Sequence, residues 1–378
     1  MKKVLIVPDS FKGTLSSEQI CSVIKERVKY HFPKAEVISL PVADGGEGTV
    51  DSFLSSVGGE LVKCRSVNPF FEDVESFWGL INNGRTAVIE MAAAAGLPLV
   101  ENKKQPMKAT TYGVGLLIKD AAERGVKEVI LGLGGSATND FGCGAASALG
   151  VAFFNKDGKA FIPTGATLSE VAGIDLSGID EKIKKIKIKI MCDVKNTVYG
   201  PSGAAYVYAP QKGASPSEVE LLDNGLRNIC DVVRRDVGKD VSMLVGGGAA
   251  GAMAAGMVSF FGAGLEMGID TVLDTVGFEA LLADADIVFT GEGKIDSQSL
   301  SGKVVSGVAK RARNAGVPVV AIVGGVDGDI KEIYDIGVNS VFTINQMPED
   351  LSTSRYKSEA NLKATVDNLL RFLSTFSV

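Results

Sequence analysis

Strand-like and helix-like hydrophobic patterns alternate at both ends of the chain. Near the N-terminus an apolar run at 4–7 is followed by a helical pattern and by a second strand pattern at 36–40. Ser16 and Gln19 have the spacing of a capping box, which predicts that the helix begins there. Near the C-terminus, three further strand patterns alternate with helical ones, at 287–289, 317–323 and 340–344. This β-α-β order predicts a parallel sheet with helices on its faces.

The middle of the chain has a different pattern. Three strand patterns between 61 and 90, joined by turns such as Asn82-Asn83-Gly84, predict antiparallel pairing. Residues 182–189 alternate lysine with isoleucine, which predicts a half-exposed strand; contact with nucleic acid is the alternative. We therefore expect an α/β protein with two α/β domains. Residues 1–66 and 287–378 would form a parallel-sheet domain, and residues 67–286 would form an inserted mixed α/β domain.

Residues 244–264 carry no charge over a length that could span a membrane. Glycine and alanine dominate the stretch, which favours a glycine loop followed by a buried helix. Its residues 246–251 also satisfy Gly-x-Gly-x-x-Gly, with Glu266 and Asp270 near the distance expected for a ribose-binding acid. A strand at 241–245 would have to precede this motif. One candidate function is therefore a dinucleotide-dependent oxidoreductase acting on a small hydroxy acid; it is the alternative to the phosphoryl transfer considered below.

Composition narrows the classes of function. The net charge of −6 disfavours broad binding to nucleic acid or to an anionic membrane. His31, the only histidine, falls at the end of the first predicted helix, so a catalytic triad or a multi-histidine metal site is nearly excluded. The five cysteines lack Cys-x-x-Cys spacing, and the apolar N-terminal run is too short for a signal peptide. We expect a cytoplasmic protein whose general base is Asp or Glu.

Several predicted strands end in loops rich in glycine, hydroxyl groups and charge. The longest, 290–303, precedes a helix and has two lysines and two carboxylates, but it lacks the spacing of a P-loop. Ligands of open α/β sheets bind at such strand ends, and a following helix N-terminus favours anions. Comparable loops contain Asp9 with Lys12, Asp44 with Glu47, Asn139 with Asp140, Asp193 with Lys195, and Asp327.

This set of residues fits phosphoryl transfer. Lysines and backbone N–H groups neutralise phosphates, carboxylates hold Mg²⁺, and one carboxylate can accept the proton of an attacking hydroxyl. Any single carboxylate here could equally be a turn or cap residue. Lys12 and Lys303 stand at helix entrances, where a cation is unfavourable unless an anion binds beside it. A binding protein without a cofactor is a third class.

Seven multi-residue motifs, in order along most of the chain, resemble those of the bacterial glycerate kinase family related to glyoxylate and glucarate breakdown. They are residues 8–12, 42–49, 89–94, 134–140, 192–196, 210–214 and 290–298. The resemblance implies ATP- and Mg²⁺-dependent phosphorylation of D-glycerate to 2-phosphoglycerate, with 3-phosphoglycerate as the lesser alternative. It also implies a Rossmann-like or flavodoxin-like domain and a mixed-sheet domain, with the active site in the cleft between them.

The matching positions give a hypothesis for the site. Asp193, Asp44 and Lys12 would be catalytic, with either aspartate as the base. The substrate would contact Lys12, Ser10, Asp44, Gly45, Gly46 and Glu47. The nucleotide phosphates would contact Gly134, Gly135, Ser136, Asn139, Asp140, Gly291, Gly293, Lys294 and Lys303. The metal would be held by Asp193, Asp296 and Glu292. The sequence leaves a homodimer open.

Overall fold

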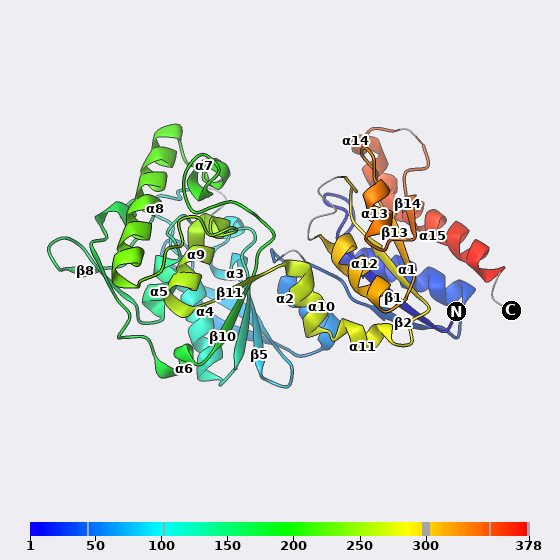
Figure 1. The fold of residues 1–378 in the computed structure, drawn as a ribbon, viewed down its shortest axis with the longest axis horizontal. Helices are drawn as coiled ribbons and strands as arrows, with labels where there is room; N and C mark the ends of the chain where they lie inside the picture. Colours follow the sequence, from blue (N-terminus) through cyan, green and yellow to red (C-terminus); the bar gives the residue numbers. More distant parts are fainter. Residues whose placement is uncertain (44, 101–102, 297–302, 348, 376–378) are drawn as a thin grey trace. The chain divides into compact units, whose positions relative to one another are not determined.

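The computed structural model describes residues 1–378 except 44, 101–102, 297–302, 348 and 376–378 (Figure 1). The chain forms two compact units. Unit 1 comprises Met1–Asp44, Ser55–Val57 and Met267–Val378, and unit 2 comprises Gly45–Leu54 and Gly58–Glu266. This division does not test the domain bounds expected from the sequence, which remain a prediction.

Unit 1 is built on a five-stranded sheet in the order β14-β13-β12-β1-β2, in which every pair is parallel. The strands are β1 (Lys3–Pro8), β2 (Glu36–Ser39), β12 (Ile287–Gly291), β13 (Val319–Val323) and β14 (Ser340–Thr343). Its helices are α1 (Ser17–His31), α10 (Gly268–Thr275), α11 (Phe278–Leu282), α12 (Val304–Asn314), α13 (Lys331–Asp335), α14 (Leu351–Ser354) and α15 (Ser358–Ser374). The parallel sheet and the capping box at Ser16 are confirmed.

The strand order of unit 1 reverses direction between β1 and β12. From β1 the chain moves to β2 on one side, then crosses to β12 and continues outward through β13 and β14. The carboxyl ends of strands at such a reversal leave a crevice where open α/β sheets bind ligands. The loops after β1 and β12 are therefore the expected binding loops of this unit.

Unit 2 is built on a mixed six-stranded sheet in the order β11-β10-β6-β5-β4-β3. The strands are β3 (Glu60–Val67), β4 (Asp73–Ile81), β5 (Thr86–Glu90), β6 (Glu128–Gly132), β10 (Lys187–Met191) and β11 (Gly264–Glu266). Strands β3, β4 and β5 pair antiparallel, as the sequence predicts, and β5, β6, β10 and β11 pair parallel. A second antiparallel sheet contains β7 (Ala152–Phe154), β8 (Ala160–Phe161) and β9 (Gly173–Asp175).

Helices of several lengths pack around the sheets of unit 2 (Figure 1). They are α2 (Thr49–Val57), α3 (Ala92–Ala95), α4 (Tyr112–Glu123), α5 (Cys143–Ala148), α6 (Glu181–Lys184), α7 (Ala204–Tyr208), α8 (Pro216–Asp236) and α9 (Ala249–Phe261). The last residues of α2, Ser55–Val57, belong to unit 1. The 3₁₀ turns are η1 (Leu97–Val100), η2 (Leu168–Glu170) and η3 (Pro210–Lys212). The buried helix expected after the glycine stretch is α9, and within the described ranges no helix is long and apolar enough to cross a membrane.

Two strand predictions are wrong. Part of 182–189 is the short helix α6, because Asp180 accepts a hydrogen bond from the Lys182 amide at 2.7 Å and caps a helical turn; the strand begins only at Lys187. Residues 241–245 form turns instead of a strand, because the Asp240 side chain bonds the Ser242 amide and hydroxyl. The dinucleotide motif therefore lacks the strand that its function requires.

Candidate active site

The loops after β1 and β12 touch at the level of the backbone. The Asp9 amide donates to the Gly291 carbonyl at 2.8 Å. At Gly293, an added Cβ would lie 3.3 Å from the Lys12 amide nitrogen and 3.4 Å from the Phe11 Cα. Glycine thus allows these two loops to approach each other closely. The structure brings residues 9–12 together with Gly291 and Gly293 at the strand-order reversal of unit 1.

Lys303 lies between two of the carboxylates predicted to hold a metal. Its Nζ is 3.7 Å from Glu292 Oε2 and 3.9 Å from Asp296 Oδ1. Lys303 is also the residue that precedes the first turn of α12. The Glu292 side chain is buried, while the Asp296 and Lys303 side chains remain partly accessible. One cation and two acids of the same loop therefore meet beside a helix N-terminus, which favours anions.

Lys294 turns toward the loop after β13 instead. Its ammonium is 2.5 Å from Asp327 Oδ2, and this pairing raises the pKa of Lys294 and lowers the pKa of Asp327. Backbone bonds link the two loops, because the Ile295 amide donates to the Gly325 carbonyl and the Asp327 amide donates to the Ile295 carbonyl. Both side chains are largely exposed, so the pair adds little to stability.

The donor set of unit 1 fits Mg²⁺ better than it fits a caged metal. Mg²⁺ takes hard oxygen ligands and usually keeps waters or phosphate oxygens beside one or two carboxylates. Glu292 and Asp296 supply such oxygens around Lys303. In the part of the chain that the structure describes, no group of three or more His, Cys, Asp or Glu side chains is arranged to hold a metal.

In unit 2 the glycine loops after β6 and before α2 lie against each other. The Gly134 amide donates to the Gly45 carbonyl at 2.9 Å. A Cβ at Gly134 would lie only 2.4 Å from the Gly46 Cα, so no larger residue fits there. Gly45 and Gly46 are buried and Glu47 is exposed. This contact joins part of the predicted substrate loop to the predicted nucleotide loop.

Glu90, which was not among the predicted site residues, fixes the predicted substrate loop. Its carboxylate is buried at the end of β5 and accepts a 2.7 Å hydrogen bond from the Val50 amide in the first turn of α2. Desolvation raises the pKa of Glu90, opposed by hydrogen bonds from the Val50 and Gly48 amides. The available signal was a single charged residue ending the apolar strand 86–90.

Asp140 is enclosed by the framework of the β6 loop. Its carboxylate accepts hydrogen bonds from the amide and hydroxyl of Thr111, both at 2.8 Å, and from the amides of Gly142 and Gly144. Desolvation raises the pKa of this fully buried carboxyl, and these four bonds lower it. Asn139 is also fully buried. The four hydrogen bonds that Asp140 accepts hold the β6 loop and the start of α5 in place.

Lys212, also absent from the predicted site, inserts its ammonium beneath the β6 loop. Its Nζ donates to Ser136 Oγ at 2.8 Å and to the Thr138 carbonyl at 2.7 Å. Burial lowers the pKa of Lys212 to about 7, and the charge of Asp140 acts in the opposite direction. The lysine ends the 3₁₀ turn η3, and its neighbour Gly213 has a φ of 97°. No hydrophobic period of the sequence singles this residue out.

The loop after β10 exposes Asp193 and Lys195. It is anchored by Asn196, whose amide donates to the Ser202 carbonyl at 2.7 Å and accepts from the Tyr208 hydroxyl at 2.6 Å. The Asn196 carbonyl in turn accepts from the Gly248 amide. The predicted carboxylate therefore stands accessible on a fixed loop of unit 2.

The glycine stretch before and within α9 packs closely against the β6 loop. Ala250, Gly251 and Ala252 all have positive φ, at 55°, 64° and 67°. A Cβ at Gly251 would lie 2.2 Å from the Thr138 carbonyl oxygen, and the Phe141 amide donates to the Gly251 carbonyl. Left-handed non-glycine residues are strained and cluster at functional sites. The motif is a packing surface and lacks the geometry of a dinucleotide fingerprint.

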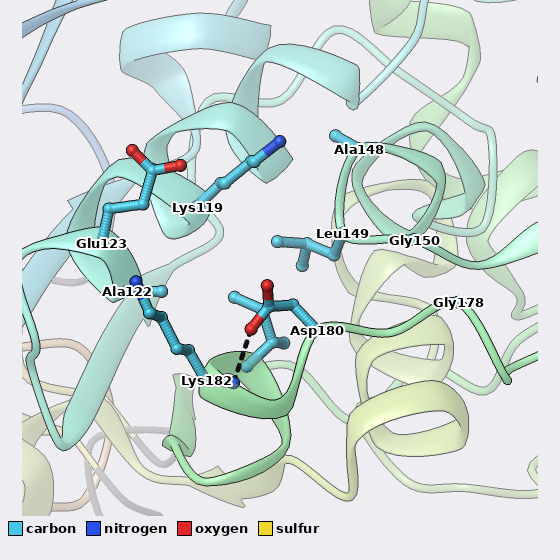
Figure 2. A pocket seen from close by; sticks show the side chains of 10 residues that line it. Lys119, Ala122, Glu123, Ala148, Leu149, Gly150, Gly178, Asp180 and Lys182 are labelled. Atoms are coloured by element: carbon cyan, nitrogen blue, oxygen red, sulfur yellow. Dashed lines mark hydrogen bonds between the residues drawn. The ribbon is translucent and has the colours of Figure 1, made fainter.

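Other parts of the molecule lie apart from these loops. His31, in the last turn of α1, pairs with Asp367 at 3.0 Å. A pocket of about 240 Å³ is lined by Lys119, Glu123, Leu149, Asp180 and Lys182, among others (Figure 2). Its residues in α4 and α6 directly precede β6 and β10, so the pocket lies toward the amino ends of these strands, opposite the loops at their carboxyl ends.

Two parts of the predicted site cannot be placed, because Asp44 and residues 297–302 lie outside the described residues.

Comparisons with known proteins give one family. A model of the glycerate kinase family matches residues 4–374. A glycerate kinase of Haemophilus influenzae is 41% identical over 373 residues, which cover 98% of this chain and 99% of the relative. The glycerate 2-kinase of Escherichia coli K12 is 40% identical over 343 residues, 90% of each chain. A Salmonella typhimurium LT2 crystal structure described as glycerate kinase 2 superposes with a TM-score of 0.88 at 39% identity, covering 100% of this chain and 99% of that one.

Proposed function

The chain belongs to the glycerate kinase family, and on that premise we propose that it is a glycerate 2-kinase, which transfers the γ-phosphate of ATP to the 2-hydroxyl of D-glycerate. The protein is a phosphotransferase, with ATP as the co-substrate that a kinase of this family implies. The Escherichia coli relative, described as a glycerate 2-kinase, supports the choice of the 2-hydroxyl.

The structural observation that carries the proposal is the cluster of Lys303, Glu292 and Asp296 at the strand-order reversal of unit 1. Phosphoryl transfer depends on positioning and on neutralising charge at the transferred group, more than on a strong base. A partly exposed cation between two carboxylates beside a helix N-terminus has these properties. Glu292 and Asp296 would hold the Mg²⁺ that accompanies ATP, and that ion would neutralise phosphate charge when bound.

The remaining predicted residues divide between the two units. In unit 1, Lys12 would bind the carboxylate of glycerate near the Ser10 hydroxyl, and Lys303 and Lys294 would bind phosphate oxygens. In unit 2, the Gly134-Gly135-Ser136 turn would contact the nucleotide phosphates. Asp193 would serve as a metal ligand or as the base, and Asp44 stays the other candidate for the base.

We assign Asp140 to the loop framework instead of to direct phosphate contact. Its carboxylate is fully buried and already accepts four hydrogen bonds. When ionised, the Asp140 carboxylate would also repel a phosphate bound at this position. Cytoplasmic location and a homodimer stay predictions from the sequence.

The proposal is tested by measuring ADP release from ATP and Mg²⁺ in the presence of D-glycerate. We expect release that depends on both D-glycerate and Mg²⁺, with little release when either is left out. A control reaction contains NAD⁺ with D-glycerate and no ATP. Formation of NADH there, without glycerate-dependent ADP release, would contradict the kinase and favour the oxidoreductase.

A further inference from the structure

We infer that Lys212 is a positioning residue for the nucleotide, which fixes residues 136–138 and places a buried positive charge beneath an ATP phosphate bound on that turn. The inference rests on the proposed function, because it takes the β6 loop as the place where the nucleotide phosphates bind. It concerns a residue that would act through the loop, without touching the transferred phosphate.

The first support is the geometry of the ammonium. It spans the turn by donating to the Ser136 hydroxyl and to the Thr138 carbonyl, on either side of Ala137. Only 2% of Lys212 is exposed. Both acceptors are uncharged, and no carboxylate of the described residues lies within ion-pair distance of Nζ. The charge therefore stays unneutralised by direct contact.

The second support is the unfavourable energy of this arrangement. Burying an ammonium without a carboxylate partner disfavours its charged form, which is why the pKa of Lys212 falls to about 7. An apolar side chain of similar length would avoid that penalty. Lys189 in the same unit shows the ordinary solution, since its ammonium lies 3.2 Å from Glu128 and 3.6 Å from Glu266.

The third support is a set of unpartnered polar atoms on the same turn. Thr138 Oγ1 and both polar atoms of the Asn139 side chain are buried and make no hydrogen bond to the residues that the structure describes. Buried donors and acceptors without partners are rare in native proteins, and each calls for a partner such as a ligand. A phosphate has acceptor oxygens that suit a hydroxyl, an amide NH₂ and the third proton of an ammonium.

Contacts other than those of Lys212 already fix the backbone of the β6 loop. The charge of Lys212 can therefore be considered apart from any role in holding the loop. The Ala137 amide donates to the Ala95 carbonyl at 2.9 Å, and the Gly134 amide donates to the Gly45 carbonyl. Gly251 packs closely against the Thr138 carbonyl. Because these contacts hold the loop, the lysine is not required to keep it folded, and its charge is the property left for function.

The test compares Lys212→Met with Lys189→Met. For each protein we would measure the dissociation constant of Mg·ATP by calorimetry, the KM values for ATP and D-glycerate, kcat and Tm. We expect K212M to weaken Mg·ATP and raise the ATP KM by on the order of tenfold or more, because a charge-assisted contribution is lost. Its glycerate KM should stay within about twofold, and its Tm should be equal or higher.

Lys189→Met should do the reverse. It leaves Glu128 and Glu266 without their cation, so its Tm should fall while its Mg·ATP affinity stays as in the wild type. Lys212→Gln is the second test variant, since it keeps a donor for the loop and removes the charge. It should lose Mg·ATP affinity as K212M does.

Normal Mg·ATP affinity in either folded Lys212 variant would overturn the inference. Failure of both variants to fold would overturn it as well, because Lys212 would then belong to the scaffold. These results are distinct from failure of the proposed function, which would appear as a wild-type protein that binds Mg·ATP but does not phosphorylate D-glycerate.

Discussion

Lys303 in unit 1 belongs to a candidate phosphate loop and Lys212 in unit 2 contacts one, but the protein holds the two lysines in opposite ways. Lys303 is 39% exposed and lies near two carboxylates of its own loop. Lys212 is buried, and its ammonium donates hydrogen bonds to two neutral oxygens, Ser136 Oγ and the Thr138 carbonyl. The unit 1 charges can separate and regroup around an arriving ion or phosphate, whereas the unit 2 amino group is held in position by hydrogen bonds before the ligand arrives.

This difference shows which surroundings suit an exposed ion pair and which suit a buried ammonium. Exposed ion pairs contribute little to stability, so a loop can rearrange them at small cost. A buried ammonium needs a rigid surrounding, and unit 2 supplies it through close backbone contacts at Gly134 and Gly251. A preorganised charge then needs no reorganisation when charge develops on the substrate. The following variants test this contrast, from the largest expected effect to the smallest.

Removing a charge from the unit 1 cluster should have the largest effect on activity. We expect Asp296→Asn to lower kcat by on the order of a thousandfold, because the metal would lose a charged ligand at the transferred phosphate. Tm should change little, since Asp296 is partly exposed. Asp329→Asn is the matched control, an exposed aspartate of the same unit near Lys331. Near-normal turnover in D296N would remove Asp296 from the metal site.

Filling the close approach behind the β6 loop should have the largest effect on stability. Gly251→Ala places a methyl group 2.2 Å from the Thr138 carbonyl oxygen and strains a φ of 64°. We expect a loss of about 3 kcal/mol or more in the free energy of unfolding, measured by urea denaturation. Gly262→Ala, at a similar φ but with open space, should lose only about 1 kcal/mol. Equal losses would show that the unit 2 loop is not held by this contact.

Replacing the lysine after β1 should separate the two substrates. We expect Lys12→Ala to raise the KM for D-glycerate by roughly tenfold and the KM for ATP by less, because an ammonium contributes a charge-assisted bond to a carboxylate. Steady-state kinetics with each substrate varied in turn gives both constants. Lys25→Ala, on the exposed face of α1, is the control. An unchanged glycerate KM in K12A would take Lys12 out of the substrate site.

The buried lysine should leave a small signature in the pH dependence of stability. Folded Lys212 loses its proton near pH 7, while the unfolded chain keeps it to about 10.5. Between these values the unfolded chain binds more protons, so this group makes stability rise with pH. Below pH 7 its penalty is constant. Asp140, the charged group that acts on it, opposes the shift.

Urea denaturation of wild type and K212M at pH 6.5, 7.5 and 8.5 measures this signature. We expect the stability advantage of K212M to shrink as the pH rises, by up to about 1.4 kcal/mol per pH unit. Mg·ATP binding should show the opposite sign in the wild type, weakening as Lys212 loses its charge. A difference between the two proteins that does not vary with pH would contradict a shifted lysine at position 212.

The fold of unit 1 could be predicted from the sequence because the patterns that indicate its strands and helices are local. Apolar runs such as 4–7 and 287–289, the capping box at Ser16 and the glycine-rich loops lie in consecutive residues, and the strands follow them. The apolar residues 241–245 misled because Met243 and Val245 stay 76% and 63% exposed. An apolar run predicts a strand only where the tertiary structure buries it.

The candidate site was predictable only in part. The cluster around Lys303 lies within one loop, so the residues that compose it could be named from the sequence. Lys212 and Ser136 are far apart in the chain, and their contact depends on how η3 folds back on β6. Glu90 likewise bonds the amide of Val50, which lies 40 residues away in the chain. Their roles come from tertiary contacts that no spacing rule encodes.

The central claim is that this protein phosphorylates the 2-hydroxyl of D-glycerate, and the most direct test is the proton-coupled ³¹P NMR spectrum of the product. A phosphate on the 2-oxygen sits beside a carbon with a single hydrogen and gives a doublet. A phosphate on the 3-oxygen sits beside a CH₂ group and gives a triplet. We predict a new doublet that grows with ADP and requires D-glycerate, ATP and Mg²⁺. A triplet would contradict the position of transfer, and the absence of any new phosphate ester would contradict the kinase itself.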